Sequence, residues 1–258
     1  MKILCIESAD STNNWLARNE EALPSPCVVR CHTQTAGRGQ RGNSWESQPG
    51  KNFTGSLLLH PSYLPACKQF ILSEAVALAI IATLKEYGIE AKVKWPNDIY
   101  VGNKKITGIL AEHVVNGRNI SRSIVGIGLN VNQEKFFSDA PNPTSMKNET
   151  LTEYDIDLIA ARLAANIEEY LNRAGLIDQR CVESESPEEK EDKAHTLHEE
   201  FLEALWRKDG ELYPFVDKIR QETFQARISD VAPDGILTLE TASGDTRKYA
   251  FKEIEFVI

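Results

Sequence analysis

The feature of this sequence that most constrains its fold is a run of three apolar segments joined by tight turns. The segments are 99–101, 105–112 and 123–131, and the turn pairs Gly102-Asn103 and Asn116-Gly117 separate them. Pairs of Asn and Gly supply the positive φ angles that short hairpin turns need. We therefore expect three neighbouring antiparallel strands, which form the centre of a sheet.

Two long apolar stretches are expected to be helices. Residues 70–87 carry apolar side chains on nearly every face, which is typical of a buried helix, and Gly88 then ends it. Residues 156–170 repeat apolar positions at helical spacing, so they predict a helix that covers the sheet and ends near Gly175. A short helix after Ser11 and strands at 1–6, 28–33, 52–60 and 89–93 complete an α+β pattern.

The last third of the chain changes character. Residues 183–203 are strongly acidic, and the apolar residues of their later half predict a helix docked by one edge, with the charges in solvent. Short strands at 224–230, 236–241 and 247–251 then alternate with turn sequences. We expect two domains, a larger one over residues 1–215 and a small β module over residues 216–258.

Composition narrows the class of function. The chain has 258 residues and a net charge of −9, which argues against a broad basic surface for DNA, RNA or anionic lipid. Its apolar runs are too short for a signal peptide or a membrane span, and five cysteines without a C-x-x-C pair suit a reducing cytoplasm. Cys27, Cys31 and His32 lack a convincing second pair of ligands for zinc, so we expect free thiols.

A glycine-rich segment, Gly37-Arg38-Gly39-Gln40-Arg41-Gly42-Asn43-Ser44-Trp45, resembles a loop that holds an anion. Its glycines let backbone N–H groups converge on a phosphate or carboxylate, and a guanidinium matches two such oxygens. Trp45 could cover a flat ring. On these nine residues alone, a solvated loop whose arginines face water is an equally good interpretation.

A second segment, Lys94-Trp95-Pro96-Asn97-Asp98, follows a strand-like stretch. Pro96 restrains its own φ and the preceding residue, and Asn97-Asp98 favours a tight turn, so Lys94 is expected at a stiff corner. A fixed cation suits catalysis. Taken alone, the pentapeptide is more simply a turn with an incidental surface lysine.

Two further segments follow along the chain, Lys105-Ile106-Thr107-Gly108-Ile109-Leu110 and Gly126-Ile127-Gly128-Leu129-Asn130. With all four segments in this order, the chain resembles a biotin protein ligase. The resemblance implies a mixed, largely antiparallel sheet backed by helices, like that of class II synthetases and biotin or lipoate ligases, with an SH3-like C-terminal module. It also implies that biotin and ATP form biotinyl-adenylate, after which biotin passes to a lysine of a carrier protein.

The resemblance also assigns roles to residues. Lys94 and Arg38 would be catalytic, because cations must offset the repulsion between a carboxylate and a triphosphate before they can react. The biotin-binding residues would be Ser11, Thr12, Asn13, Gln34, Gly37, Arg38, Gly126 and Gly128. The residues that bind ATP or the adenylate would be Arg38, Gln40, Arg41, Trp45, Lys94, Lys105 and Asn130. No protein-bound metal is expected, and Mg²⁺ would arrive with the ATP phosphates.

Simpler interpretations of several of these residues stay open. Ser11 could be only a helix cap, the strand glycines could mark a bulge or close packing, and Lys105 could face solvent. The nearest rival function is a lipoate ligase, whose glycine-rich signature differs. A biotin-binding regulator without catalysis would not need a cation at the α-phosphate.

The resemblance further implies an acceptor, the carrier domain of a biotin-dependent carboxylase. Some family members begin with a winged-helix domain that binds DNA. Here the Ser11-Thr12-Asn13 element lies almost at the N-terminus, so no DNA binding is expected. We also expect a cytoplasmic protein without membrane attachment, and a homodimer through the sheet edge is compatible with the sequence.

Gln40 departs from the family pattern, since many members carry arginine at this fourth position of the glycine-rich motif. Glutamine is neutral and offers fewer donors, so we expect looser retention of the adenylate. Gln40→Arg should therefore slow release of biotinyl-adenylate, measured by trapping the released intermediate over time. An unchanged release rate would contradict this prediction.

Overall fold

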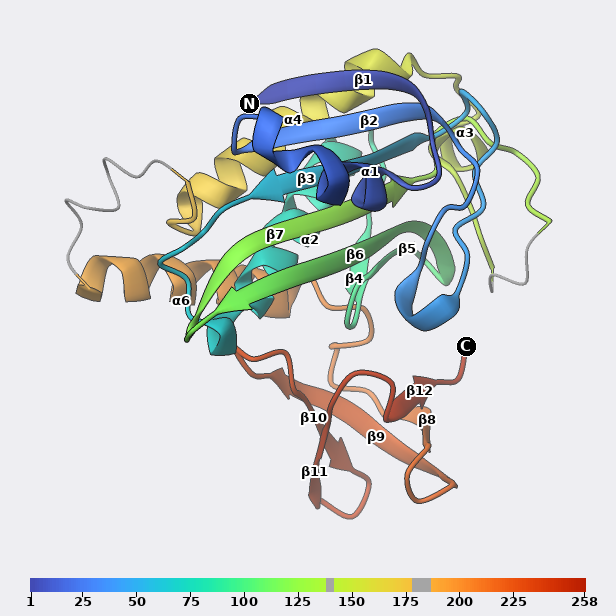
Figure 1. Cartoon of the computed structure of the whole chain (residues 1–258). Helices are drawn as coiled ribbons and strands as arrows, with labels where there is room; N and C mark the ends of the chain where they lie inside the picture. The colour runs from blue at the N-terminus through green and yellow to red at the C-terminus, as the bar shows by residue number, and fades with distance from the viewer. Residues whose placement is uncertain (138–141, 178–186) are drawn as a thin grey trace.

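The computed structural model describes residues 1–137, 142–177 and 187–258, except for the side chains of Arg41 and residues 187–190. The described residues include a seven-stranded sheet (Figure 1). From one edge to the other its strands are β1 (Lys2–Ala9), β2 (Cys27–Gln34), β3 (Phe53–Leu59), β7 (Asn119–Leu129), β6 (Lys104–Asn116), β5 (Asp98–Val101) and β4 (Lys92–Lys94). Only β1 and β2 run parallel, and the other neighbours are antiparallel. The expected mixed, largely antiparallel sheet is confirmed.

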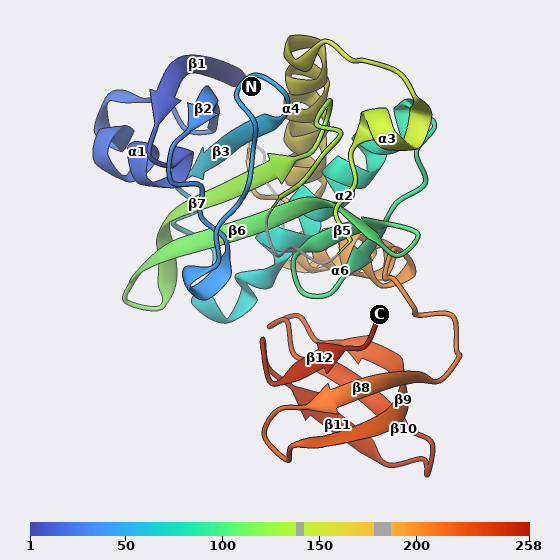
Figure 2. The ribbon, with the colours of Figure 1, turned by 90° about the vertical axis from the view of Figure 1, so that its right-hand side faces the viewer.

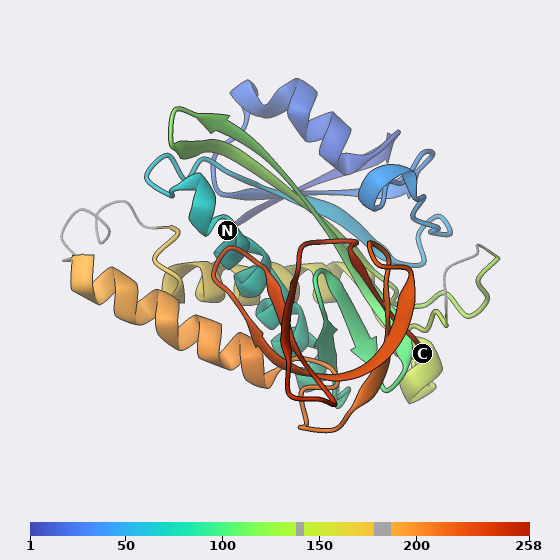
Figure 3. The same cartoon turned by 90° about the horizontal axis from the view of Figure 1, so that it is seen from below.

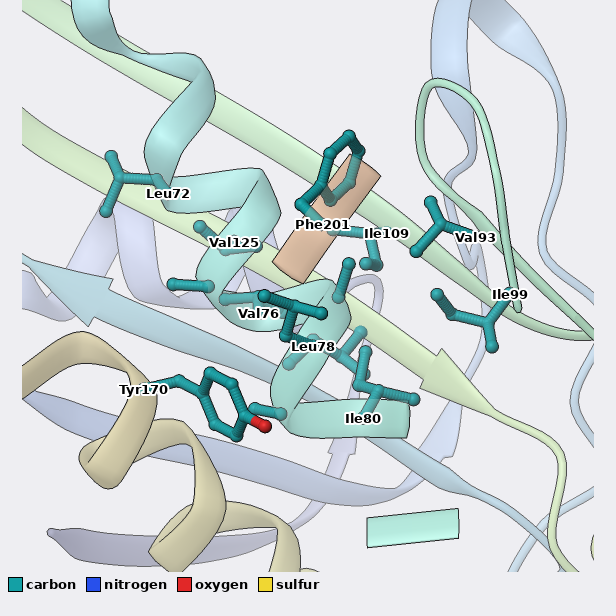
Figure 4. Packing of buried hydrophobic residues seen from close by; sticks show 14 of the residues in the cluster. Leu72, Val76, Leu78, Ile80, Val93, Ile99, Ile109, Val125, Tyr170 and Phe201 are labelled. Atoms are coloured by element: carbon teal, nitrogen blue, oxygen red, sulfur yellow. The ribbon is translucent and has the colours of Figure 1, made fainter. Parts of the chain in front are cut away.

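Three helices cover one face of this sheet, namely α2 (Phe70–Glu86), α4 (Ile156–Arg173) and α6 (Pro187–Glu203). Figure 4 shows Leu72, Val76 and Ile80 of α2 packed among side chains of the sheet and α6. The helix α1 (Thr12–Asn19) lies on the opposite face, where Leu16 completes a smaller cluster with side chains of β2, β3 and β7. The sheet therefore separates two apolar layers of unequal size.

Helix α2 is apolar over most of its length, which corrects the expectation that every apolar run is too short for a membrane span. Together with the short turn η3 (Ala66–Lys68) before it, the stretch Ala66–Glu86 is long and apolar enough to cross a bilayer. Most side chains of α2 are buried against the sheet, α4 and α6. Packing in the protein core therefore accounts for its composition.

The meander predicted from the turn pairs is confirmed, and β6 and β7 extend beyond the predicted bounds. The strand expected at 89–93 begins only at Lys92, because Gly88 has a φ of 75° and a short connection follows. Sequence analysis missed α3 (Met146–Thr150) and the short turns η1 (Glu20–Ala22) and η2 (Gln40–Gly42). Of the acidic stretch, residues 183–186 lie outside the described residues, and the remainder belongs to α6.

A second sheet forms the C-terminal module. Its strands are β8 (Tyr213–Asp217), β9 (Glu222–Val231), β10 (Leu237–Thr241), β11 (Thr246–Tyr249) and β12 (Ile254–Phe256), in the order β11-β10-β9-β8-β12. The expected small β module is confirmed. The expected boundary after residue 215 falls inside β8, which pairs with β9 and β12, so the module begins earlier, at Tyr213.

The C-terminal module lies below the seven-stranded sheet in Figures 1 and 2. A column of aromatic rings joins it to the larger domain. The rings of Phe201 and Phe70 lie 5.5 Å apart, those of Phe70 and Phe251 5.9 Å, and those of Phe251 and Trp95 5.3 Å. Trp95 also donates a hydrogen bond of 3.0 Å from Nε1 to the carbonyl of Gly235. The module thus contacts the first residue of α2, which in turn packs on α6, and the corner after β4.

Phe201→Ala should destabilise the protein by about 3–5 kcal/mol, because it removes a fully buried ring from the start of this column. The free energy of unfolding from urea titration is the measurement. The control is Leu158→Ala on α4, whose residue is 65% exposed and should change stability by less than about 0.5 kcal/mol. Equal effects would show that the column does not hold α6 in place.

Candidate functional site

A cavity of about 550 Å³ opens on the sheet face opposite α2, between the meander strands and the glycine-rich loop. The glycines of β6 and β7 that line it are Gly108, Gly126 and Gly128. Alternate residues of the same strands, such as Ile109 and Val125, belong to the core beneath. One face of these strands therefore packs the core, while the other carries glycines where it meets the cavity.

Glycine is needed at these positions because other side chains approach the strand backbone closely, and not because the strands bulge there. Their strands pair in regular register at these positions. A Cβ on Gly128 would lie 2.3 Å from the ring of Trp45, and one on Gly108 would lie 2.9 Å from the same ring. A Cβ on Gly126 would lie 2.6 Å from Oδ1 of Asn13. Trp45 and Asn13 thus lie directly on the bare strands.

A buried polar cluster forms one wall of the cavity, at the start of α1. The backbone N–H of Thr12 donates to Oε1 of Gln34 at 2.9 Å, and the Thr12 hydroxyl donates to the same oxygen at 3.2 Å. Ser56, which sequence analysis missed, donates to Oγ1 of Thr12 at 2.6 Å and lies 2.5 Å from Oδ1 of Asn13. Ser11 stands at the N-cap, yet its side chain makes no capping hydrogen bond and the residue lines the cavity.

Arg38 lines the cavity and is held by two partners that sequence analysis did not identify. Its Nη2 donates to Oε1 of Glu112 at 2.8 Å, and its Nη1 donates to Oδ1 of Asn14 at 2.6 Å. The other oxygen of Glu112 accepts a hydrogen bond of 2.7 Å from Asn13. Glu112 lies at the end of the predicted strand 105–112, and nothing in its sequence context marks it as a partner of Arg38.

Two N–H groups of the glycine-rich loop are bonded within the loop itself. The N–H of Gly39 donates to the carbonyl of Asn43 at 2.7 Å, and the N–H of Trp45 donates to the carbonyl of Gly37 at 2.9 Å. These donors therefore close the loop on itself. Gln40 lines the cavity, while the side chain of Arg41 lies outside the described part of the chain.

The two predicted lysines occupy different places. Lys105 lines the cavity, its Nζ lies 2.7 Å from Oδ1 of Asp98, and the same Nζ lies 5.7 Å from the centre of the Trp45 ring. The alternative in which Lys105 simply faces solvent does not apply, since its side chain is 22% exposed and ion-paired.

Lys94 stands at the corner that ends β4, as expected, but it is not among the described residues that line the cavity. It belongs to the edge strand β4, and β5 stands between it and the cavity. Its Nζ lies over the rings of Tyr100 and Phe256, at 5.2 and 5.1 Å from their centres. Burial lowers the pKa of this ammonium, and nearby Asp98 opposes the shift. Lys94 thus contacts the C-terminal module.

Two polar atoms in residues that line the cavity are buried without a hydrogen-bond partner in the described part of the chain. They are the donor Nε1 of Trp45 and the acceptor Oδ1 of Asn130. The amide of Asn130 is oriented by a hydrogen bond of 2.9 Å from Nδ2 to the carbonyl of Thr144. Buried groups of this kind normally have partners, so both atoms are candidates for contact with a ligand.

Sequence analysis also missed three residues that line the cavity from later segments, namely Phe136, Pro143 and Lys252. Phe136 and Pro143 belong to the connection after β7. Lys252 belongs to the C-terminal module, between β11 and β12. None of them lies in a motif, because their positions depend on how distant segments pack.

Known proteins are similar to this chain in both sequence and fold. Residues 5–130 match the biotin/lipoate A/B protein ligase family. The bifunctional ligase/repressor BirA of Bacillus subtilis is 30% identical over 252 residues, covering 95% of this chain and 70% of that protein. The biotin--[acetyl-CoA-carboxylase] ligase of Paracoccus denitrificans is 34% identical over 177 residues, covering 62% of this chain and 72% of that protein.

Among solved structures, the biotin protein ligase from Aquifex aeolicus in complex with biotin and ATP superposes with a TM-score of 0.76 at 22% identity, covering 98% of this chain and 97% of that chain. This likeness supports the fold, and the relative from Bacillus subtilis supports the family over nearly the whole sequence. The chain belongs to the biotin protein ligase family.

Proposed function

We propose that this chain is an ATP-dependent biotin protein ligase that makes biotinyl-adenylate and transfers biotin to a lysine of a carrier domain. The observation that carries the proposal is the cavity itself. The cavity is lined by the glycines of β6 and β7 and by the polar wall at Thr12 and Gln34. The cation of Lys105 lies in the same cavity, beside Trp45. Family membership supplies the class of reaction.

In the first step, an oxygen of the biotin carboxylate attacks the α-phosphorus of ATP, and the bond to pyrophosphate breaks. Both reactants are anions, so a fixed cation must offset their repulsion. We assign this role to Lys105 and not to Lys94, because Lys105 lies in the cavity. Trp45 would lie against adenosine, and Asn130 would offer its unpartnered oxygen.

Biotin would lie toward the polar wall. The ureido ring needs both donors and acceptors, which Ser11, Thr12, Asn13 and Gln34 supply. Arg38 lies at the same wall and would attract the carboxylate, in competition with its present partner Glu112. Gly37 is not among the described residues that line this cavity, but a Cβ on it would lie 3.3 Å from Nε2 of Gln34, which does line it.

In the second step, the neutral amine of the carrier lysine attacks the acyl carbon, an amide forms and AMP leaves. The amine loses a proton in this step. Asp98 lines the cavity beside Lys105, so its carboxylate can accept that proton.

The donors present fit a magnesium ion brought by ATP. Asp98 and Asn130 line the cavity and offer the oxygen ligands that Mg²⁺ prefers, together with phosphate oxygens. When bound, the ion would neutralise phosphate charge during displacement of pyrophosphate.

The acceptor we propose is the carrier domain of a biotin-dependent carboxylase, and the compartment is the cytoplasm. We propose no DNA partner, because a net charge of −9 disfavours a broad basic surface. A homodimer is compatible with the exposed edge strand β1.

Lys105→Ala should lower the rate of biotinylation about 10²–10³-fold, because it removes a preorganised cation at the reacting centre. The measurement is the intact mass of a biotin carboxyl carrier domain after timed incubation with Mg-ATP and biotin. Lipoate is the parallel control for the rival ligase.

Two matched lysine variants sharpen this test. Lys104→Ala removes the neighbouring ammonium, which pairs with Glu149, and Lys94→Ala removes the lysine at the edge strand. Neither should approach the loss caused by Lys105→Ala. A greater loss in Lys94→Ala than in Lys105→Ala would overturn the assignment, and lipoyl addition without biotinyl addition would overturn the substrate.

The two strand glycines should control different substrates. Gly128→Ala places a Cβ against Trp45 and should raise the KM for ATP about tenfold, whereas Gly126→Ala places one against Asn13 and should raise the KM for biotin instead. Initial rates of adenylate formation at varied ATP and biotin measure both constants. If both variants changed the same constant, the proposed placement of the two substrates would be wrong.

A further inference from the structure

Gln133 is fully buried, belongs to no motif, and is not among the described residues that line the cavity. Its Oε1 accepts hydrogen bonds from the N–H of Gln48 at 3.0 Å and from Nδ2 of Asn52 at 2.6 Å. Its Nε2 donates to Oε1 of Glu46 at 2.9 Å and to the carbonyl of Lys135 at 3.0 Å. An amide group has two acceptor positions and two donors, and all of them are used here. A buried amide with all of its partners fixes the segments that it joins.

The partners of Gln133 are themselves bonded to the connection after β7. Oε2 of Glu46 accepts from the N–H of Phe137 at 2.9 Å, and Oδ1 of Asn52 accepts from the N–H of Val131 at 3.0 Å. Glu46, Asn52 and Gln133, which we name the Gln133 cluster, therefore join three segments. These are the end of the glycine-rich loop, the residue before β3 and the connection after β7.

Three residues that line the cavity immediately precede residues of this cluster or its backbone partners. They are Trp45, Asn130 and Phe136, which precede Glu46, Val131 and Phe137. The backbone has two soft dihedral angles per residue, so fixing one residue restricts where its neighbour can lie. Gln133 is therefore linked to the cavity through the chain, without lining it.

The residues linked in this way belong to one half of the cavity. Trp45 lies on Gly108 and Gly128, and its buried Nε1 has no hydrogen-bond partner in the described part of the chain. The same holds for the buried Oδ1 of Asn130. The polar wall at α1 depends on a separate set of hydrogen bonds, which includes no residue of the Gln133 cluster. The two unpartnered atoms can meet one ligand only where both backbones keep their separation.

Resting on the proposed function, we propose that Gln133 is a positioning residue for ATP. It holds Trp45, Asn130 and Phe136 at the separation that the adenosine and phosphate groups require, while biotin binds at the polar wall without its help. Loss of a general structural support would weaken the binding of both substrates alike. Loss of the Gln133 cluster should weaken the binding of ATP selectively.

Two variants of Gln133 remove its contacts in different ways. Gln133→Met keeps the approximate size and the charge, and removes all four hydrogen bonds. Gln133→Glu instead places a second carboxylate beside Glu46, and the two repel each other. Adding Glu46→Gln to Gln133→Glu restores a donor and an acceptor, because the amide at position 46 can donate to the carboxylate at position 133. Glu46→Gln alone is the reference for this pair.

Asn166→Leu is the matched control. Asn166 is a buried amide of α4 that donates to Oγ1 of Thr83 and to Oε1 of Glu86, at 3.0 Å each. Like Gln133 it donates to a carboxylate, but it is not among the described residues that line the cavity and it belongs to the helical layer. Its replacement should lower the melting temperature and leave the KM values for ATP and biotin nearly unchanged.

ATP affinity is measured by calorimetry with Mg-ATP, and initial rates of biotinyl-adenylate formation at varied ATP and biotin give both KM values. We expect Gln133→Met and Gln133→Glu to weaken ATP binding and raise the KM for ATP about tenfold, with the KM for biotin nearly unchanged. Glu46→Gln should improve the ATP affinity of Gln133→Glu by more than it improves that of the unmodified protein, because the hydrogen bond is restored only in the pair.

Unchanged ATP affinity in Gln133→Met would overturn the inference, and so would parallel rises in the KM values for ATP and biotin. An equal effect of Glu46→Gln in both backgrounds would also overturn it, because charge alone would then explain Gln133→Glu. If Gln133→Met failed to fold, this pair would decide. Failure of the unmodified protein to form biotinyl-adenylate would instead contradict the proposed function, while ATP affinities from calorimetry would still test the role of Gln133.

Discussion

The burial of Trp95 is the constraint on which the geometry of the site depends. Its indole is 2% exposed, bonded to the carbonyl of Gly235 and packed on Phe251. The next residues are pinned to β6, since Asn97 exchanges hydrogen bonds with the backbone of Ile109 at 2.6 and 2.9 Å. Asp98 therefore has one position, and Lys105 has a fixed partner. The same indole fixes the C-terminal module, so loosening it would disturb both domains.

The central strands β6 and β7 stabilise the sheet with one face and line the cavity with the other. Ile109, Val125 and Ile127 point to the helices, and each buried side chain of this kind stabilises the fold by roughly 1.5–3 kcal/mol. Glycine within a strand costs about 0.5–1 kcal/mol relative to alanine. Core packing on one face thus offsets the glycines that open the other. The stability of the sheet comes from the face that ligands do not touch.

Sequence patterns predicted the parts of the fold that depend on local chemistry. Turn pairs gave the meander, apolar periodicity gave α2 and α4, and the motifs gave Trp45, Gln34 and the strand glycines at the cavity. Position across the sheet is a property of strand order, which no local pattern contains. Lys94 stands at a stiff corner as expected, yet on the edge strand, whereas Lys105 is the second residue of β6, which lies nearer the centre of the sheet. Glu112 and Lys252 were missed for the same reason.

The ion pairs within the cavity influence which ligands it binds. Lys105 and Arg38 each have a carboxylate partner, so an anion must compete with Asp98 or Glu112 for them. A single weak anion gains little from this exchange, because each cation gives up one charged partner for another. A carboxylate and a triphosphate bound together offer several negative groups and bring a magnesium ion to balance Asp98. The internal ion pairs therefore hold the cations in place for the paired substrates and disfavour stray anions, which is a form of specificity that no individual motif shows.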